Sequence, residues 1–232
     1  MDNVNATPPT RERTLTVWSD IGCPWASLAL HVVRAEAASR GQQLLIEHRA
    51  FPLELFNRRP TPRPIIDAEI VAIVGLVPEL GWRMWDSPSW HYPVTTLLAM
   101  EAVQAVKAME PDGHIVSDRL DAALRQAWYA QGRCLSVPTV IEEIALSVEG
   151  LDTPRLMGAL ERGGSRQTVY DDWRDAAGGV VRGSPHFFGP EGQHLHNPGV
   201  TYHWTRSPDV GGVPRFEKYD RSWVDEVLAW MS

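Results

Sequence analysis

The sequence has few of the residues that identify several large classes of protein. Among its 232 residues there are only two cysteines, Cys23 and Cys134, far apart in the chain. Small secreted domains rely on several paired cysteines, so we do not expect a disulfide framework in this chain. We expect the protein to work in a reducing compartment, the cytoplasm.

The sequence also has fewer lysine and arginine residues than acidic ones, 22 against 29. The formal net charge is −7, and lysine occurs only at Lys107 and Lys218. Proteins that hold a phosphate backbone or an anionic membrane do so with a surplus of arginine and lysine, and no basic stripe occurs here. The sequence therefore argues against a nucleic-acid partner.

Long hydrophobic runs are missing as well. No apolar stretch approaches the roughly 20 residues that a membrane-spanning helix needs. The N-terminal segment MDNVNATPPTRERT has neither a basic start followed by an apolar core nor a small-residue cleavage site. We therefore expect a cytoplasmic protein with no membrane association.

The residues that are present predict an α/β protein. Residues 15–18 (LTVW) and 44–51 (LLIEHRAF) are typical of strands, and a helical pattern follows Cys23 between them. Such a β-α-β unit predicts two parallel strands joined by a right-handed crossover.

In the middle of the chain the sequence pattern changes from strand to helix. Pro60, Pro62 and Pro64 mark a boundary, because each proline fixes its own backbone and restricts the residue before it. Beyond it, to about Gly178, little is typical of strand. Two short strands in SPHFF and HLHNPG and a last helix, 222–231, then complete the chain. The helical patterns of the middle block cover residues 94–108, 115–131, 138–148, 154–160 and 167–177.

Cys23 directly precedes Pro24 at the start of a predicted helix. Proline suits the first helical position, and the N–H groups of Trp25 and Ala26 would then face the sulfur and favour its thiolate. Lowering a thiol pKa from about 8.5 to about 6 takes roughly 3.4 kcal/mol, of which a helix terminus supplies at most about 2. We therefore expect the thiol of Cys23 to be activated, but less strongly than it would be if position 26 held a second cysteine. The alternative is a buried, unreactive cysteine.

Three segments together resemble a known family: WSDIGCPWAS (18–27), AWYAQGRCLSVPTVIEEIA (127–145) and GVVRGSPHFF (179–188). They are similar to the DsbA-like branch of the thioredoxin superfamily, especially FrnE-type proteins, 2-hydroxychromene-2-carboxylate isomerases and kappa-class glutathione transferases. The resemblance implies a thioredoxin-like fold with an inserted, mostly helical subdomain. Its parts would be a first thioredoxin-like part at 14–64, a helical insertion at 65–178 and a second thioredoxin-like part at 179–232.

The resemblance also assigns roles to individual residues. Cys23 matches the nucleophile, and Pro24 and Trp25 match the dipeptide between two cysteines. Ala26 stands where the family has its second, resolving cysteine. Pro185 matches a proline that the family keeps in the cis form. The backbone of the residue before it, Ser184, would pair with an extended thiol peptide such as glutathione.

The alanine at position 26 limits the chemistry that the motif can perform. A single thiol can form a mixed disulfide but has no internal partner to resolve it. Cys134 lies in a predicted loop between two helices, and we do not expect it to replace that partner. We interpret Asp20 as a turn residue rather than a proton acceptor, and we expect Trp25 to be exposed beside the sulfur.

The late histidines are the other candidate site. His194 and His196 fall on one face of a predicted strand, where His186 or His203 could join them around a metal. No carboxylate or cysteine lies at a familiar ligand spacing, and we predict no metal site.

The main functional hypothesis is a thiol-disulfide oxidoreductase with a monothiol Cys-Pro-Trp-Ala site, acting on mixed disulfides or a small electrophile. It would have no tightly bound cofactor and would use a low-molecular-weight thiol, glutathione or mycothiol, as co-substrate. The alternatives are a redox-inactive thioredoxin-like binding module and a glutathione-dependent isomerase or transferase. Helical insertions in this family often support homodimers, but this sequence has no exposed stripe of residues that requires a homodimer.

Overall fold

The computed structural model of the chain describes residues 13–109 and 111–231. Its strands are β1 (Thr14–Ser19), β2 (Leu45–Ala50), β3 (His186–Phe188), β4 (His194–His196), β5 (Val200–Trp204) and β6 (Pro214–Tyr219). Its helices are α1 (Pro24–Ser39), α2 (Leu53–Asn57), α3 (Arg63–Leu76), α4 (Leu97–Lys107), α5 (Gly113–Tyr129), α6 (Pro138–Ala145), α7 (Thr153–Glu161), α8 (Arg166–Ala177) and α9 (Trp223–Trp230). None of the helices in these ranges has the length and apolar character needed to cross a membrane.

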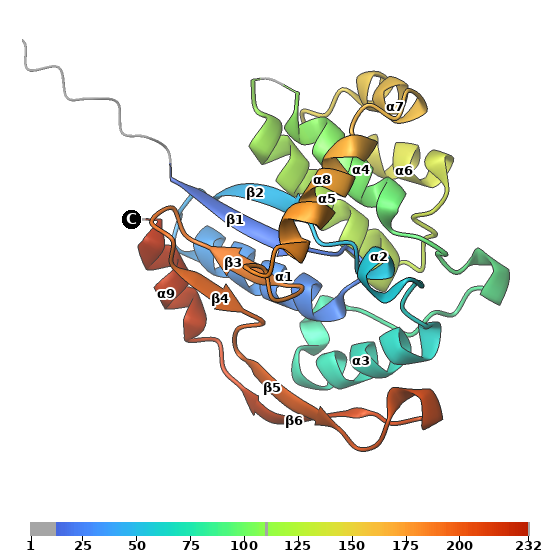
Figure 1. Cartoon of the computed structure of the whole chain (residues 1–232), viewed down its shortest axis with the longest axis vertical. Coiled ribbons are helices and arrows are strands. Elements are labelled where there is room, and N and C mark those ends of the chain that lie inside the picture. The colour runs from blue at the N-terminus through green and yellow to red at the C-terminus, as the bar shows by residue number, and fades with distance from the viewer. Residues whose placement is uncertain (1–12, 110, 232) are drawn as a thin grey trace, which may run out of the picture.

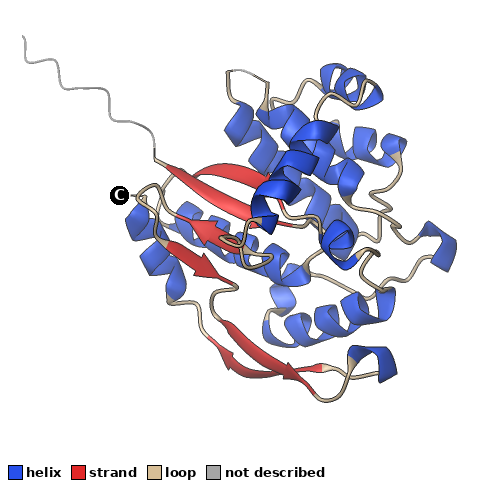
Figure 2. Cartoon of the chain, viewed as in Figure 1, coloured by secondary structure: helices blue, strands red, loops and turns tan. Residues whose placement is uncertain are grey.

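The main sheet has four strands in the order β2-β1-β3-β4 (Figures 1 and 2). Strands β1 and β2 run parallel, which confirms the β-α-β prediction for the start of the chain. Strand β3 is antiparallel to β1, and β4 is antiparallel to β3. The α/β fold class predicted from the sequence is confirmed.

The two faces of the sheet are covered differently. Helices α1 and α9 lie side by side on one face, where Leu15, Val17 and Phe187 are fully buried (Figure 1). On the other face, a small cluster of Trp18, Phe51 and Ala176 joins the sheet to α8. Both faces are therefore shielded near the end of β1, where the loop to α1 begins.

The helical block α4–α8 covers the β2 edge of the sheet. The side chains of Gln104 and Lys107 donate to the carbonyl oxygen of His48, at 3.0 and 2.6 Å. The carboxylate of Asp172 accepts from the N–H of Ala50 at 2.7 Å. An open strand edge offers unpaired backbone groups to other chains, so these contacts also protect the sheet.

Strands β5 and β6 form a separate antiparallel hairpin that the sequence patterns did not predict. In Figure 1 the hairpin extends away from the main sheet and runs along α3. Helix α3 was not predicted individually either, since its start lies within the proline-rich boundary. These two elements approach the start of α1 and turn out to decide the environment of Cys23.

Candidate active site at Cys23

Cys23 is the N-terminal cap of α1, as its position before Pro24 predicted. Its backbone is extended, with φ −94° and ψ 110°, and its carbonyl oxygen accepts the first helical hydrogen bond from Ser27, at 3.0 Å. The expected capping of backbone N–H groups by the sulfur is wrong, because the side chain makes no such bond. The thiol instead donates to the carbonyl oxygen of Ser184 at 3.3 Å.

The Ser184–Pro185 loop lies directly against the Cys23 loop. The peptide bond between the two residues is cis, the form that the family resemblance implied. The hydroxyl oxygen of Ser184 accepts from the N–H of Asp20 at 2.9 Å, and the carbonyl oxygen of Pro185 accepts from the N–H of Asn197 at 2.9 Å. Ser184 therefore contacts the cysteine loop through both its side chain and its backbone.

Asp20 shapes the turn that leads to Cys23. Its carboxylate oxygens accept from the N–H groups of Gly22, at 2.7 Å, and Leu53, at 2.8 Å. Burial raises the pKa of Asp20, although these hydrogen bonds oppose the rise. The interpretation of Asp20 as a turn residue is confirmed.

Helix α5 of the inserted block holds the same loop from the other side. The Arg125 guanidinium donates to the carbonyl oxygen of Asp20 at 3.0 Å and to the hydroxyl of Ser27 at 2.9 Å. One turn later, the hydroxyl of Tyr129 donates to the carbonyl oxygen of Ile21 at 3.0 Å. Both donor side chains are buried. The position of Cys23 thus depends on residues more than 100 positions away in the sequence.

Trp25 is buried, so the expectation of an exposed indole at this position is wrong. Its ring stacks on Tyr202 of β5 with centroids 4.3 Å apart, and Phe216 of β6 meets it edge-on at 5.6 Å. Its Nε1 donates to a carboxylate oxygen of Glu69 in α3 at 2.9 Å. The hairpin and α3 together enclose the indole and leave only 6% of Trp25 exposed.

The Cys23 thiol is not activated in this arrangement. Only 5% of the residue is exposed. Burial raises the pKa of Cys23 to about 12, the carboxylates of Glu69 and Asp20 add to the rise, and the nearby polar groups of Ser184 and Ala26 only partly oppose it. The expectation of an activated thiol is therefore wrong here, since desolvation and negative neighbours outweigh the helix terminus.

Glu69 is the functional candidate that the sequence analysis missed. The residue is 8% exposed, and burial raises its pKa to about 7 despite the hydrogen bond from Trp25. A sequence signal exists: Glu69 directly precedes the apolar run IVAIVGL (70–76) and lies at helical spacing from Ile66 and Ile73, on the buried side of α3. The hydrogen bond that joins Glu69 to Trp25 was not predictable from that pattern.

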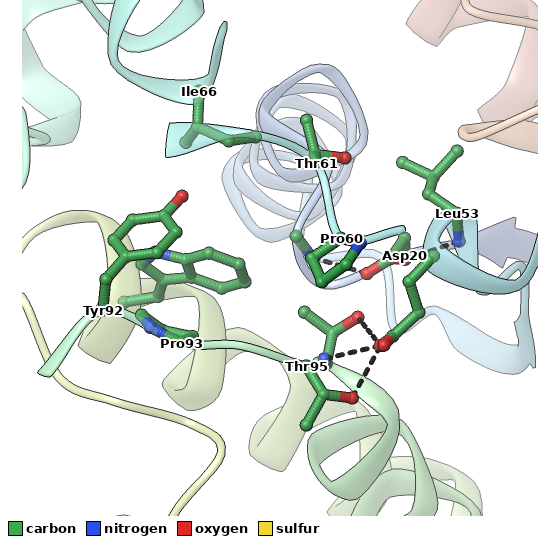
Figure 3. Close-up of a pocket in the computed structure, with 12 residues that line it drawn as sticks. Asp20, Leu53, Pro60, Thr61, Ile66, Tyr92, Pro93 and Thr95 are labelled. Carbon is green, nitrogen blue, oxygen red and sulfur yellow. Dashed lines mark hydrogen bonds between the residues drawn. The ribbon is translucent and has the colours of Figure 1, made fainter. Parts of the chain in front are cut away.

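A small cavity lies beside the cysteine loop (Figure 3). Its walls include Asp20 before α1, Thr61 before α3, and Tyr92 and Thr95 before α4. Its volume is about 20 Å³, which is space for about one water molecule. Cys23 does not line it, so a substrate would have to create its own access to the sulfur.

The late histidines form a hydrogen-bonded cluster near the Ser184–Pro185 loop. The Nδ1 atom of His186 accepts from the N–H of Arg182 at 3.1 Å, so a neutral His186 carries its proton on Nε2, which lies 3.2 Å from Nδ1 of His194. His196 lies beside His186, whereas His203 pairs with Glu217. Both nitrogens of His186 are occupied in these bonds, which disfavours it as a metal ligand.

A different group brings potential metal ligands together. Within residues 13–109 and 111–231, His48, Asp118 and Asp121 place ligand atoms within 4.8 Å of one another. The guanidinium of Arg34 contacts both carboxylates, at 2.5 and 2.6 Å, and Arg125 contacts Asp121 at 2.9 Å. Arginine already neutralises the two carboxylates, so we interpret the group as a structural charge network between α1, β2 and α5.

Both cysteines are free thiols. Cys134 is half-buried in the loop between α5 and α6. Its exclusion as a resolving group stays a prediction.

The fold and the site can be compared with known proteins. No family model matches the chain, and no curated protein sequence matches it. A probable DsbA oxidoreductase from Streptomyces coelicolor is similar in structure, with 17% identity, a TM-score of 0.64 and coverage of 94% of this chain and 89% of that one. The cytosolic disulfide reductase DsbM from Pseudomonas aeruginosa, solved with GSH, has 16% identity, a TM-score of 0.59 and coverage of 93% and 99%.

A third similar structure is a 2-hydroxychromene-2-carboxylate isomerase, with 12% identity, a TM-score of 0.54 and 94% coverage of both chains. In all three cases nearly the whole chain is aligned, including the helices between β2 and β3. The chain therefore shares the fold of these three proteins, a thioredoxin-like α/β fold carrying additional helices.

Proposed function

We propose that the protein catalyses thiol-disulfide exchange in the cytoplasm, with Cys23 as its single nucleophile and glutathione or mycothiol as the co-substrate. The observation that carries this proposal is the contact between the Cys23 thiol and the carbonyl oxygen of Ser184, at 3.3 Å, at the start of α1. This contact supports the proposal, because a Ser184–Pro185 loop beside a free thiol would offer its backbone to an extended thiol peptide. The glutathione-bound disulfide reductase of similar fold supports the choice of co-substrate.

The reaction needs one thiol on the protein and one from solution. The Cys23 thiolate attacks a mixed disulfide, forms a new disulfide with one half and releases the other half as a thiolate, which takes up the proton lost by Cys23. A molecule of the external thiol then attacks the protein-bound disulfide and forms a disulfide with the bound half, which leaves the protein, while Cys23 takes up the proton of the external thiol and is regenerated. The external thiol thereby performs the step that a cysteine at position 26 would perform in a dithiol site.

The proposal requires the site to open. Cys23 is buried, which raises its pKa, and the β5–β6 hairpin packs on Trp25, two residues further along the chain. Movement of the hairpin away from Trp25 would hydrate the thiol and bring its pKa towards the ordinary value of about 8.5. We interpret the closed arrangement as the resting form of the enzyme.

Mass spectrometry of the folded protein tests the proposal. Incubation with glutathione disulfide or mycothiol disulfide should give an adduct on Cys23 that excess thiol removes. Cys134→Ser is the matched control and should keep the adduct, whereas Cys23→Ser should lose it. Absence of an adduct on the folded protein, or an adduct confined to Cys134, would contradict the proposal.

The burial of Cys23 also favours a second candidate, a binding module without redox chemistry. In that case Cys23→Ala would leave ligand binding and biological effect unchanged. A glutathione-dependent isomerase or transferase is the third candidate, and the isomerase of similar fold is its support. It would consume a small electrophile without forming a protein-bound disulfide, which the same mass spectra distinguish.

A further inference from the structure

The charges that act on the Cys23 thiol are negative. Within the described residues, the carboxyl group of Glu69 reaches the site from α3 and that of Asp20 from the loop before α1, and both raise the pKa of the thiol. The phenols of Tyr129 in α5 and Tyr202 in β5 lie close enough for Cys23 to raise their pKa values in turn. The elements packed around the sulfur thus present acids to it.

The cations near this site are engaged elsewhere. The Nε of Arg125 donates to Asp121 at 2.9 Å, and its other nitrogens hold the loop before Cys23. In α3, Arg63 pairs with Asp67 at 3.0 Å and donates to the carbonyl oxygen of Trp85 at 2.7 Å. Neither guanidinium is available to neutralise the carboxylate of Glu69.

Glu69 is fixed beside the motif by geometry. Its carboxylate accepts from Nε1 of Trp25 at 2.9 Å, and Trp25 is two residues from Cys23. The stacked ring of Tyr202 closes the same indole from the hairpin side. Displacement of Tyr202 would therefore expose Glu69 and Cys23 together to an incoming substrate.

We propose that Glu69 makes the Cys23 site select disulfides by charge, favouring those with a cationic amino group beside the sulfur and disfavouring anionic ones. This inference rests on the proposed thiol-disulfide exchange and adds the class of its substrate. At short range a carboxylate attracts a cation and repels an anion, and it does so more strongly at a protein surface than in bulk water. A cationic substrate also offsets the negative charge that holds the thiol in its protonated form.

The reaction that reveals this preference is a single exchange. Cys23 attacks one sulfur of a symmetrical disulfide RSSR, the S–S bond breaks, and the products are the Cys23–S–S–R mixed disulfide and RSH, which carries the proton lost by Cys23. Because the same thiol attacks every substrate, the ratio of two rate constants does not depend on how much of Cys23 is ionised before the substrate arrives.

Three small disulfides of similar size test the proposal: cystamine, which is cationic, bis(2-hydroxyethyl) disulfide, which is neutral, and dithiodiglycolate, which is anionic. Rate constants for formation of the Cys23 adduct are measured by intact mass in the Cys134→Ser protein, which has no other thiol. The measurements are made at about pH 8 and at low salt, because charges are least screened at low salt. We expect cystamine to react at least about tenfold faster than dithiodiglycolate, after each rate constant is divided by that of the neutral thiol 2-mercaptoethanol with the same disulfide, which removes the difference between the leaving thiols.

Glu69→Gln keeps an oxygen to accept from Trp25 and removes the charge. It should reduce the ratio of the cystamine and dithiodiglycolate rates to within about threefold. The matched control, Glu79→Gln, removes one charge from an exposed position near the end of α3 and should leave the ratio unchanged. An unchanged ratio in Glu69→Gln, or an equal loss in Glu79→Gln, overturns the proposal.

A measurement that needs no change at position 69 covers the case in which Glu69→Gln does not fold. Salt screens charges that solvent reaches, so the ratio in the Cys134→Ser protein should fall towards one as the ionic strength is raised to about 1 M. A ratio near one at pH 8 and low salt overturns the charge selection while the neutral disulfide still demonstrates exchange. If none of the three disulfides reacts with the folded protein, the proposed function fails and the inference fails with it.

Discussion

The indole of Trp25 and the phenol ring of Tyr202 lie stacked, with centroids 4.3 Å apart and ring planes 20° from parallel. This pair joins the cysteine motif at the start of α1 to a hairpin close to the end of the chain. Tyr202 also lies close enough to Cys23 for the thiol to raise the pKa of the phenol.

Removal of the Tyr202 ring should make Cys23 more reactive. Tyr202→Ala would hydrate the thiol, and the rate of alkylation by iodoacetamide at about pH 8 should rise on the order of tenfold or more as the pKa falls. His203→Ala alters an exposed neighbour on the same strand and should leave the rate unchanged. Equal rates in Tyr202→Ala and the unmodified protein would mean that the hairpin does not cover the sulfur.

Removal of the Tyr129 hydroxyl should destabilise the loop before Cys23. Tyr129→Phe leaves the buried carbonyl oxygen of Ile21 without this donor, which should lower the free energy of unfolding by about 1 to 2 kcal/mol. Urea unfolding measures this as a lower midpoint with the same slope. Tyr170→Phe alters a less buried phenol in α8 and serves as the comparison, with an expected change within about 0.5 kcal/mol.

Acid should weaken the charge network of α5. Burial alone would raise the pKa of Asp118, but the charge of Arg34 and the hydrogen bond from His48 outweigh it and lower the pKa to about 2. A carboxyl group with a lower pKa in the folded state stabilises it above its unfolded pKa of about 4. The free energy of unfolding should therefore fall by about 2 kcal/mol from this group as the pH drops from about 4 to about 2.

The control for this acid effect is an exposed carboxyl group. Asp118→Asn should flatten the dependence of the unfolding free energy on pH in this range, whereas Asp171→Asn in α8 should not. The same steep dependence in Asp118→Asn would assign the acid sensitivity to other groups.

Gly199 at the base of the hairpin should tolerate no side chain. Its φ is +76°, and a Cβ atom there would lie 2.3 Å from the carbonyl oxygen of Asp220 and 2.5 Å from the ring of Trp223. Gly199→Ala should lower the melting temperature and increase alkylation of Cys23, because the hairpin must shift to relieve the clash. Gly192→Ala has a similar φ, +89°, but an open environment, so it isolates backbone strain from the clash and should leave Cys23 protected.

Local sequence patterns predicted the elements that depend on local periodicity. The strands at 15–18 and 44–51, the helix after Cys23 and the five helical patterns of the middle block all correspond to observed elements. The turn role of Asp20 was also predictable, since aspartate bonds to backbone N–H groups close to it in sequence. The cis bond at Pro185 was expected only from the family resemblance.

The burial of the site was not predictable from local patterns. Trp25 looked exposed because its neighbours in sequence do not cover it, while its real partners are Glu69 in α3 and Tyr202 in β5. Strand β6 escaped prediction because its register against β5 shifts next to Thr201 and Tyr202 and its burial pattern is irregular, whereas β5 alternates but is only half-buried on its inner side. The thiol pKa was predicted with the wrong sign because the helix start is a local feature and desolvation is not.

The hydrogen bonds from α5 to the cysteine loop also determine when the motif can take its shape during folding. Arg125 and the carbonyl oxygen of Asp20 are 105 residues apart, Tyr129 and Ile21 are 108 apart, and Cys23 and Ser184 are 161 apart. Contacts of such long sequence separation form late, after the intervening chain has been ordered. A nascent chain that ends before α5 therefore carries the Cys-Pro-Trp-Ala sequence without its geometry, and its cysteine stays an ordinary hydrated thiol until the rest of the protein has been made.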